Sequence, residues 1–414
     1  MSKTDEIVVI GAGVIGISIG LELVRAGYSV RVLDREGLAA GASQGNAGAF
    51  AFTDIVPLAT PGIMRKAPKW LLDPLGPLSI PLRYALKIAP WMLRFWRASW
   101  KDRYHHSVEA QTALMSLAKE ALERQITSTD GESLILRQGQ MQLYEGEKEF
   151  RASLPQWELR REQGIRYELF ETPEDIARIQ PGLDPRFTHA GYTPDWINTV
   201  DPKTWVEHLA SAFTALGGVI EKRDIHNLSH TAGGVRLTYS GGEIHATKAI
   251  VAAGAWSHHL AKTLGDKFPL ETERGYNTTL PKGAFDVRTH LTFSGHGFVV
   301  TPINGGARVG GAVELGGLDL PPNYKRADIL LKKAASFLPG LNTEGGTQWM
   351  GFRPSLPDTL PVIGTAPQAQ NVIYAFGHGH LGLTQAAATA EIVKTMVQGK
   401  PAPIDTTPYR PTRF

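Results

Sequence analysis

The sequence predicts an α/β protein in which a discontinuous domain with a parallel sheet is interrupted by an α+β insert that contains an antiparallel sheet. Three observations support this prediction. A strand, a glycine-rich turn, a helix and a second strand follow one another over residues 7–34. A buried strand that ends in small residues recurs at 248–254, and a strand, a glycine loop and a helix recur at 371–397. Between these last two units, a β-hairpin pattern covers residues 298–313.

The first unit is typical of a Rossmann-like dinucleotide site. Gly11 permits a tight turn, Gly13 lets backbone N–H groups approach a pyrophosphate, and Gly16 lets the helix pack closely on the strand. The helix N-terminus attracts the phosphate charge. Asp34, at the end of the second strand, is expected to bind a ribose hydroxyl pair. The predicted contacts of this unit are Gly11, Gly13, Val14, Ile15, Gly16, Asp34 and Arg35.

NAD and FAD use the same motif, and the segment that follows favours FAD. Residues 39–49 form a loop of small residues with no bulky side chain before Phe50. One interpretation is a flexible linker. The interpretation we favour is backbone pressed against a large flat ligand, because only small residues allow that approach. An isoalloxazine ring fits such a loop. The predicted cofactor contacts here are Ser43, Asn46, Ala47 and Gly48.

Composition limits the class of protein. The 414 residues are 42% hydrophobic and 20% charged, which is ordinary for a globular enzyme. No apolar run approaches the roughly 18 residues of a membrane-spanning helix. The first residues lead directly into a strand, so we expect no signal peptide and a cytoplasmic location. The absence of cysteine excludes disulfides, thiol catalysis and a cysteinyl flavin link, so FAD is expected to be bound non-covalently. No spacing predicts a metal site.

Residues 57–104 form a basic, tryptophan-rich segment. They include nine basic and two acidic residues, a net charge of +7 in a chain whose total is +3. At about 100° per residue, five basic side chains share one side of a helix. They are Arg83, Lys87, Arg94, Arg97 and Lys101. Apolar side chains occupy the opposite side, at Leu86, Ala89, Met92, Leu93, Trp96 and Trp100.

Two interpretations of this segment stay open. A basic amphipathic helix suits a membrane interface or an acidic partner, such as an electron acceptor. The alternative, which we favour, is a surface helix whose apolar side faces the core. Pro90 must kink this helix or begin a second one.

The chain is expected to leave and re-enter the dinucleotide domain. Asp201-Pro202 is typical of a helix start, because Asp caps a helix and Pro fits its first turn. The strand at 248–252 ends in Ala253 and Gly254, which with Trp256 are predicted cofactor contacts. We assign residues 1–56, 198–262 and 347–414 to the dinucleotide domain, and residues 57–197 and 263–346 to a substrate domain.

The closing segment predicts a second helix N-terminus beside the cofactor. A glycine loop lies between the strand at 371–376 and an alanine-rich helix predicted over 385–397. If this helix points at the N1–C2=O edge of a flavin, its dipole stabilises the anionic reduced ring. For His378 and His380, hydrogen bonds that maintain the loop are the alternative role. The predicted cofactor contacts here are Gly379, His380, Leu381, Gly382, Leu383 and Thr384.

Taken together, these motifs resemble the D-amino acid oxidase superfamily of flavoproteins, most closely its bacterial D-amino acid dehydrogenase branch, over nearly the whole chain. Besides the first glycine motif and the loop at 43–48, the resemblance rests on the segments 253–257, 274–276, 351–354, 357–364 and 377–384.

The resemblance implies that FAD lies along a Rossmann-like FAD-binding domain and that substrate is bound between the flavin and a β-rich domain. It implies oxidative deamination of a D-amino acid by hydride transfer from Cα to flavin N5, with electrons passed to a quinone or a protein acceptor. The segment 378–384 is similar to that of relatives that oxidise D-proline or cis-4-hydroxy-D-proline, which favours these substrates over D-alanine. Two residues depart from the family pattern: Asp34 replaces the usual glutamate, and His380 replaces smaller residues.

Three residues are expected to contact the substrate. Arg353 would pair bidentately with its carboxylate, or else tie its strand to the loop at Asp358. Tyr276 would donate its hydroxyl to the same carboxylate, or is a core aromatic. His380 would approach the amine or the 4-hydroxyl of a proline ring. No strong side-chain base is required, because the lone pair of a neutral amine drives hydride departure.

Other functions remain as alternatives. An oxidase would return electrons to oxygen and release peroxide. An NAD-dependent dehydrogenase would explain the first motif but not the C-terminal return to the dinucleotide domain. A non-catalytic flavoprotein subunit is supported only by residues 57–104, where an electron acceptor or the inner face of the membrane would dock. We expect a small D-amino acid as substrate and no nucleic-acid partner.

Overall fold

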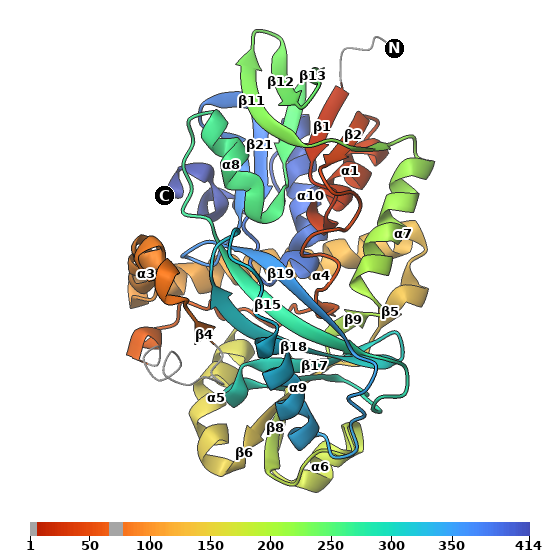
Figure 1. Ribbon diagram of the computed structural model, residues 1–414, viewed down its shortest axis with the longest axis vertical. Coiled ribbons are helices and arrows are strands. Elements are labelled where there is room, and N and C mark those ends of the chain that lie inside the picture. The colour runs from red at the N-terminus through yellow and green to blue at the C-terminus, as the bar shows by residue number, and fades with distance from the viewer. Residues whose placement is uncertain (1–5, 66–77) are drawn as a thin grey trace.

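The structure is a computed structural model that describes residues 6–65 and 78–414. Three separate stretches of chain build a six-stranded sheet in the order β10-β2-β1-β14-β21-β20, seen in the upper half of Figure 1. Five of its strands are parallel, and β20 is antiparallel at one edge. The strands are β1 (Glu6–Ile10), β2 (Ser29–Asp34), β10 (Val219–Lys222), β14 (Lys248–Val251), β20 (Val362–Ala366) and β21 (Ala369–Phe376).

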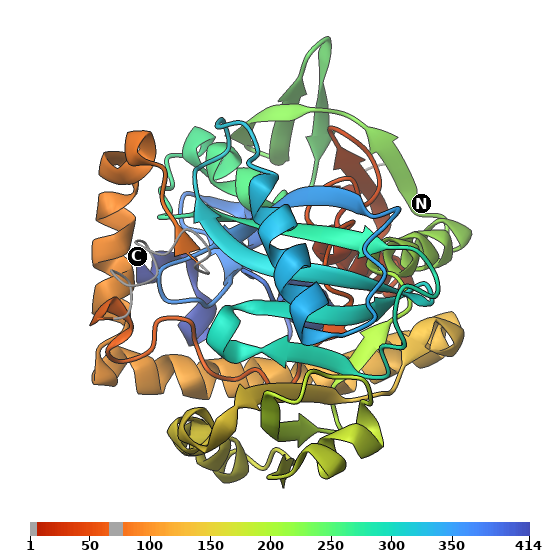
Figure 2. The same cartoon turned by 60° about the horizontal axis from the view of Figure 1, so that its bottom comes forward.

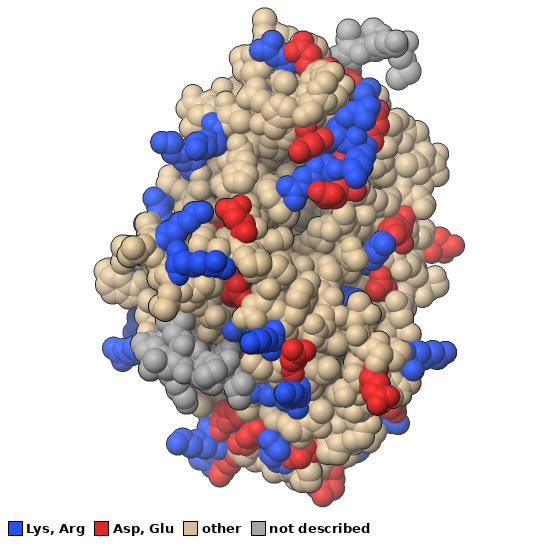
Figure 3. Space-filling model, viewed as in Figure 1, with Lys and Arg blue, Asp and Glu red and all other residues tan. Residues whose placement is uncertain are grey.

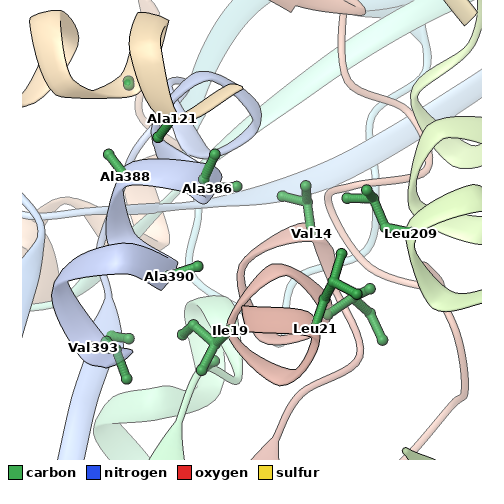
Figure 4. Packing of buried hydrophobic residues seen from close by; sticks show 14 of the residues in the cluster. Val14, Ile19, Leu21, Ala121, Leu209, Ala386, Ala388, Ala390 and Val393 are labelled. Atoms are coloured by element: carbon green, nitrogen blue, oxygen red, sulfur yellow. The ribbon is translucent and has the colours of Figure 1, made fainter. Parts of the chain in front are cut away.

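Four helices pack on one face of this sheet. They are α1 (Val14–Arg25), α4 (Lys101–Thr129), α7 (Pro202–Ala215) and α10 (Gly382–Gln398). Figure 4 shows Ala390 of α10 beside Ile19 of α1, and small side chains of α10 such as Ala386 and Ala390 let the two helices approach closely. As predicted, Asp201 caps α7 by accepting a 3.0 Å hydrogen bond from the Thr204 N–H.

The opposite face of the six-stranded sheet packs against a small antiparallel sheet and a short helix. These elements are β11 (Ile225–Thr231), β12 (Gly234–Tyr239), β13 (Gly242–Ala246) and α8 (Ser257–Thr263). Because the side chains of β1 alternate, Val9 joins the core under the four helices, whereas Val8 joins the core on this side.

A second, larger sheet forms the lower half of the molecule. Its order is β19-β15-β18-β17-β16-β6-β8-β7, with β4 also paired to β18. Most neighbours are antiparallel, as the sequence predicts. The strands are β4 (Leu78–Ser79), β6 (Gln140–Glu145), β7 (Glu168–Phe170), β8 (Phe187–Thr193), β15 (Glu271–Leu280), β16 (His290–Phe293), β17 (Phe298–Ile303), β18 (Gly306–Leu315) and β19 (Thr347–Ser355).

Helices flank this sheet, and short strands connect it to the rest. Figure 2 shows α9 lying across the sheet, with α5 and α6 at its far end. The helices are α3 (Ala85–Ala98), α5 (Gly146–Glu162), α6 (Pro173–Ile179) and α9 (Lys325–Phe337). A three-stranded sheet joins β3 (Ala49–Phe50), β9 (Ile197–Thr199) and β5 (Ile135–Leu136). The predicted hairpin is present: Asn304 and Gly305 both have positive φ angles, of 50° and 73°, between β17 and β18.

One predicted domain boundary and one predicted domain assignment differ from the structure. Residue 347 does not begin the return to the dinucleotide domain, because β19 pairs along its whole length with β15 of the larger sheet. The chain returns only at β20. Within the segment 57–197, helix α4 packs against α10 and contributes side chains such as Leu114 and Ala118 to the core of the six-stranded sheet. No motif in the sequence assigns α4 to the sheet that it covers.

Two glycines of the first motif are required by close backbone contacts. Gly11 has a φ of +113°, and a Cβ atom there would lie 2.3 Å from the carbonyl oxygen of Ala252. A Cβ atom on Gly16 would lie 1.8 Å from the carbonyl oxygen of Gly11. The start of α1 is therefore in backbone contact with the turn after β1.

We predict that Gly16→Ala lowers the free energy of unfolding by about 1–3 kcal/mol, since overpacking a close contact costs that much. Urea unfolding of the purified protein, followed by circular dichroism, measures the change. Gly41→Ala is the matched control, because a Cβ atom at Gly41 meets nothing within 4 Å. Equal unfolding midpoints for the two variants would contradict the packing argument.

Candidate active site

A cavity of about 830 Å³ lies between the two sheets. One wall consists of residues at the carboxyl ends of β1, β2, β14 and β21, including Ile10, Leu33 and Ala252. The other wall consists of residues on β15, β18 and β19, including Tyr276 and Arg353. Open parallel sheets bind their ligands outside the carboxyl ends of the strands, where this cavity lies.

Asp34 closes the dinucleotide end of the cavity. Its Oδ2 accepts a hydrogen bond of 2.8 Å from the Ala12 N–H, and its Oδ1 accepts from Glu36 and Gly37. A carboxylate has about four acceptor positions, so capacity remains for a ribose hydroxyl. Ser43 Oγ accepts a 3.0 Å hydrogen bond from the Val14 N–H, and both residues line the cavity. The first helix therefore begins at the cavity, as predicted.

The small-residue loop at 39–49 is fastened to the larger sheet. Asn277 donates a 2.8 Å hydrogen bond to the carbonyl oxygen of Gly45, and Arg308 donates to that of Asn46. A Cβ atom on Gly45 would lie 2.1 Å from the Trp349 ring. Gly45, Asn46 and Ala47 line the cavity. The flexible-linker interpretation is therefore wrong: the loop is fixed by these hydrogen bonds, leaves no room for a side chain at Gly45, and forms part of the cavity wall.

A second helix begins at the cavity. Helix α10 starts at Gly382, three residues before the predicted start, and Gly382 and Leu383 line the cavity. Thr384 Oγ1 accepts a 2.9 Å hydrogen bond from the Ala51 N–H, which fixes this helix start to the chain after the small-residue loop. Gly16, Gly48 and Thr384 support the wall without lining the cavity, whereas the other predicted cofactor contacts line it.

Predicted cofactor contacts also lie beside the end of β14, where a guanidinium group stacks on an aromatic ring. The Arg35 guanidinium lies 3.8 Å from the centre of the Trp256 ring, and Trp256 packs edge-on against Phe352. With Ala253 and Gly254 they line the cavity beside the end of β14.

Arg353, on β19, is one of the cations that line the opposite wall. Within the described chain its guanidinium makes one hydrogen bond, of 3.2 Å to the carbonyl oxygen of Ala312, and no ion pair within 4 Å. It lies flat across β15, because a Cβ atom on Gly275 would be 2.2 Å from its Nη2. Burial inside the cavity lowers the pKa of Arg353, an effect that the charge of Glu273 opposes. This guanidinium retains donors for an anionic ligand.

The Tyr276 hydroxyl has other partners. It donates a 2.9 Å hydrogen bond to Glu314 and accepts one of 3.0 Å from the Asn323 N–H. Burial raises the pKa of Tyr276, and Glu314 adds to this effect. Its ring reaches the cavity wall, but its hydroxyl proton is already engaged, so we do not include Tyr276 among the substrate donors.

His380 pairs with an aspartate that the sequence motifs did not identify. His380 Nε2 lies 3.2 Å from Asp54 Oδ2, and both residues line the cavity. Burial raises the pKa of Asp54, but the hydrogen bond and charge of His380, together with the charge of Arg160, hold it below its usual value of 3.8. Arg160 and His290 also line this part of the cavity. They come from α5 and β16, which the sequence gives no reason to place beside residue 54.

Comparison with known proteins agrees with this architecture. Residues 6–396 match the family described as FAD dependent oxidoreductase, or DAO. A D-amino-acid oxidase of Bradyrhizobium diazoefficiens is 34% identical over 100% of both chains. A D-amino acid dehydrogenase of Rhizobium rhizogenes is 28% identical over 99% of this chain and 100% of its own. This chain belongs to the DAO family.

Solved structures share the DAO fold. Glycine oxidase from Geobacillus kaustophilus aligns with a TM-score of 0.79 at 20% identity, covering 99% of this chain and 100% of its own. L-Proline dehydrogenase from P. horikoshii aligns with a TM-score of 0.75 at 19% identity, covering 100% of this chain and 98% of its own. The predicted fold class and the predicted superfamily are both confirmed.

FAD is the cofactor of this DAO family member, and the cavity fits it. The glycine turn leaves backbone exposed where a pyrophosphate is expected, because a Cβ atom on Gly13 would meet only Ser43 Oγ, at 3.2 Å. Two helix N-termini face the same space, which favours anionic groups. The wall between them is made of small residues, which leaves room for a flat ring.

His378 fixes the glycine loop to helix α10. Its Nε2 lies 3.0 Å from Thr389 Oγ1 of α10, which is the local role considered for it. Burial lowers the pKa of His378 to about 3. Burial also lowers the pKa of His290 to about 3, against the opposing charge of Asp54. Both imidazoles are therefore neutral at pH 7.

Because His290 and His378 are buried and neutral, we predict that the free energy of unfolding decreases in acid. Unfolded histidine has a pKa of about 6.5, so between about pH 6.5 and pH 3 the unfolded chain binds protons that the folded protein excludes. The free energy of unfolding should then fall by up to about 1.4 kcal/mol per pH unit for each buried histidine. Urea unfolding at a series of pH values measures this slope. His378→Asn should make it shallower, and His230→Asn, at an exposed position, should not. Identical slopes in all three proteins would contradict the assignment.

Proposed function

We propose that this protein is an FAD-dependent D-amino acid dehydrogenase that removes a hydride from Cα of its substrate and yields an imino acid. D-Proline and cis-4-hydroxy-D-proline are the favoured substrates, with D-alanine as a further candidate, and the electron acceptor is a quinone or another protein. The observation that carries this proposal is the guanidinium of Arg353, which faces the FAD cavity without a carboxylate partner.

The surroundings of Arg353 argue for a substrate carboxylate. The alternative partner considered from the sequence, Asp358, is already paired with Arg413 at 2.7 Å. Glu273 is opposite Arg353 in the strand register, but its Oε1 accepts a 2.7 Å hydrogen bond from Ser355. A planar guanidinium binds a carboxylate through two parallel hydrogen bonds. The carboxylate of a bound amino acid would therefore accept hydrogen bonds from the donors of Arg353 that have no partner within the described chain.

When bound, FAD supplies the hydride acceptor of the reaction. The chain contributes orientation: Arg353 fixes the carboxylate from the wall formed by the larger sheet, which restricts how the rest of the substrate lies in the cavity. The D configuration is supported by the two relatives that align over their full length, both described as acting on D-amino acids.

The pair of His380 and Asp54 supports a ring substrate with a hydroxyl group. An imidazole nitrogen that is hydrogen-bonded to a carboxylate is fixed in orientation, and the two residues together can donate to and accept from a 4-hydroxyl. His380 is half-buried at the cavity wall, where it is accessible to a ligand.

An oxidase is the second candidate. It is favoured by the 34% identical relative, which is described as a D-amino-acid oxidase, whereas the 28% identical relative is described as a dehydrogenase. Both candidates share the reductive half of the reaction and differ only in the acceptor that reoxidises the flavin.

We predict that Arg353→Met raises the apparent KM for the amino acid by about 30-fold to several thousandfold while FAD stays bound. Loss of one partner of a buried charged pair costs about 2–5 kcal/mol, and about 1.4 kcal/mol corresponds to a factor of ten. Steady-state kinetics measure KM, and the visible flavin spectrum measures FAD content. Arg353→Lys should recover part of the loss, because it restores the charge without the planar fork.

A second variant tests the same geometry without removing the charge. Gly275→Ala places a methyl group where the guanidinium lies, so it should also raise KM. Gly233→Ala is the control, since a Cβ atom there meets nothing within 4 Å. A KM left unchanged in both Arg353→Met and Gly275→Ala would assign Arg353 a purely structural role.

The substrate proposal predicts bleaching of the flavin band. Purified protein mixed anaerobically with D-proline, cis-4-hydroxy-D-proline or D-alanine should lose its visible absorbance, and the L-forms should leave it unchanged. Admission of air separates the two candidates: slow recovery of the band indicates a dehydrogenase, and rapid recovery with peroxide indicates an oxidase. A yellow protein that none of these D-amino acids bleaches would exclude the proposed substrates.

A further inference from the structure

A stripe of large apolar side chains faces solvent along α3 and its two ends. We call it the α3 stripe. Leu82 is 93% exposed, Leu86 91%, Leu93 63%, Trp96 47% and Trp100 46%. At about 100° per residue these five positions fall within an arc of about 80°. Isolated exposed leucines are normal, but an aligned set of this kind marks an interaction surface.

The stripe is not the side by which α3 packs on the protein. That side carries Tyr84, Ile88 and Trp91, which cluster with Leu315 of β18. The favoured interpretation, in which the apolar side predicted from the sequence faces the core, is therefore wrong for Leu86, Leu93, Trp96 and Trp100. The helix has two apolar sides, and only one of them is covered within the described chain.

Basic residues lie between these two sides. Arg83, Lys87, Arg94 and Lys101 are all exposed, and Arg97 pairs at 2.8 Å with Asp102, the single acidic residue between positions 78 and 104. Figure 3 shows blue side chains at the left of the molecule, where Figure 1 places α3. The predicted segment also includes Lys66, Lys69 and Trp70, which lie outside the described residues.

We propose that the α3 stripe and its basic flank dock on the surface of an anionic lipid bilayer. A helix that lies in the interface inserts leucine and tryptophan side chains at the boundary of headgroups and acyl chains, and its basic side chains contact lipid phosphates. The separate apolar and basic arcs of α3 have this arrangement. In the part of the chain that the structure describes, no helix is both long and apolar enough to cross a bilayer.

Charge argues against the simplest protein partner, a second copy of this chain. In a two-fold symmetric dimer the same surface is used by both copies, so the basic flanks of both, with Arg83, Lys87 and Arg94, would be brought to one interface. Like charges at an interface oppose association, whereas anionic headgroups are complementary to them.

The docking proposal does not rest on the amino acid substrate. If the electron acceptor is a quinone dissolved in the bilayer, docking would bring the flavoprotein to it. Binding can be measured on the resting FAD-loaded protein, so failure of the substrate proposal and failure of this one are separate results.

The test is cosedimentation of the FAD-loaded protein with vesicles of phosphatidylcholine containing about 30 mol% phosphatidylglycerol, an anionic lipid. The protein should pellet with these vesicles and not with phosphatidylcholine alone. Leu86→Ser with Leu93→Ser should abolish pelleting. Arg83→Gln with Arg94→Gln should weaken the partition coefficient about 25-fold, at about fivefold for each basic residue. Binding should also weaken as salt rises.

Leu216→Ser is the matched control, because Leu216 is an exposed leucine at the end of α7, away from the stripe. All variants should retain the flavin spectrum of the parent, since none of these side chains lines the cavity. Failure of the parent protein to pellet, or pelleting unchanged by the double leucine variant, would overturn the proposal. A dimer in vesicle-free solution that the double leucine variant abolishes would assign the stripe to a second copy instead.

Discussion

The arrangement of the cavity depends on one set of hydrogen bonds that joins the two sheets. Asn277 and Arg308, on neighbouring strands of the larger sheet, donate to the carbonyl oxygens of Gly45 and Asn46 in the small-residue loop. Both donor side chains are buried. Arg308 also lies 3.7 Å from Asp201, the cap of α7. Because buried polar groups that lose their partners are costly, this network fixes the substrate wall relative to the dinucleotide wall.

Two arginines on the larger sheet differ in their hydrogen-bond partners, and this difference distinguishes a structural arginine from a ligand-binding one. Arg274 is fully buried, and its guanidinium donates to Glu314 and to the carbonyl oxygens of Gly317, Leu320 and Pro321. These hydrogen bonds occupy the donors of the Arg274 guanidinium and fix the loop after β18. Arg353 lies on the neighbouring strand with one carbonyl partner and an open side toward the cavity. A half-buried guanidinium with unused donors facing a cavity is the physical sign of a ligand-binding group, and of these two arginines only Arg353 has it.

On helix α3, too, residues of the same type differ in their surroundings: some apolar side chains pack on the protein and others face solvent. Periodicity in residues 83–101 correctly separates basic from apolar positions, but it does not say which apolar positions touch the protein. The structure covers Tyr84, Ile88 and Trp91 and leaves Leu86 and Leu93 in solvent. A helix can present two apolar sides, one to the core and one to a partner, and both give the same sequence signal.

Features that depend on local geometry can be predicted from the sequence. Three such features are the strand, glycine turn and helix at residues 7–25, the helix cap at Asp201 and the hairpin at Asn304. Each follows from backbone conformations and hydrogen bonds within a few residues, so a short sequence pattern predicts it. Contacts between groups far apart in the chain depend instead on how the whole chain folds. The tertiary structure places Asp54 beside His380, covers the six-stranded sheet with α4, assigns β19 to the larger sheet and engages the Tyr276 hydroxyl with Glu314. These pairings join residues up to 326 positions apart, and no local pattern encodes such contacts.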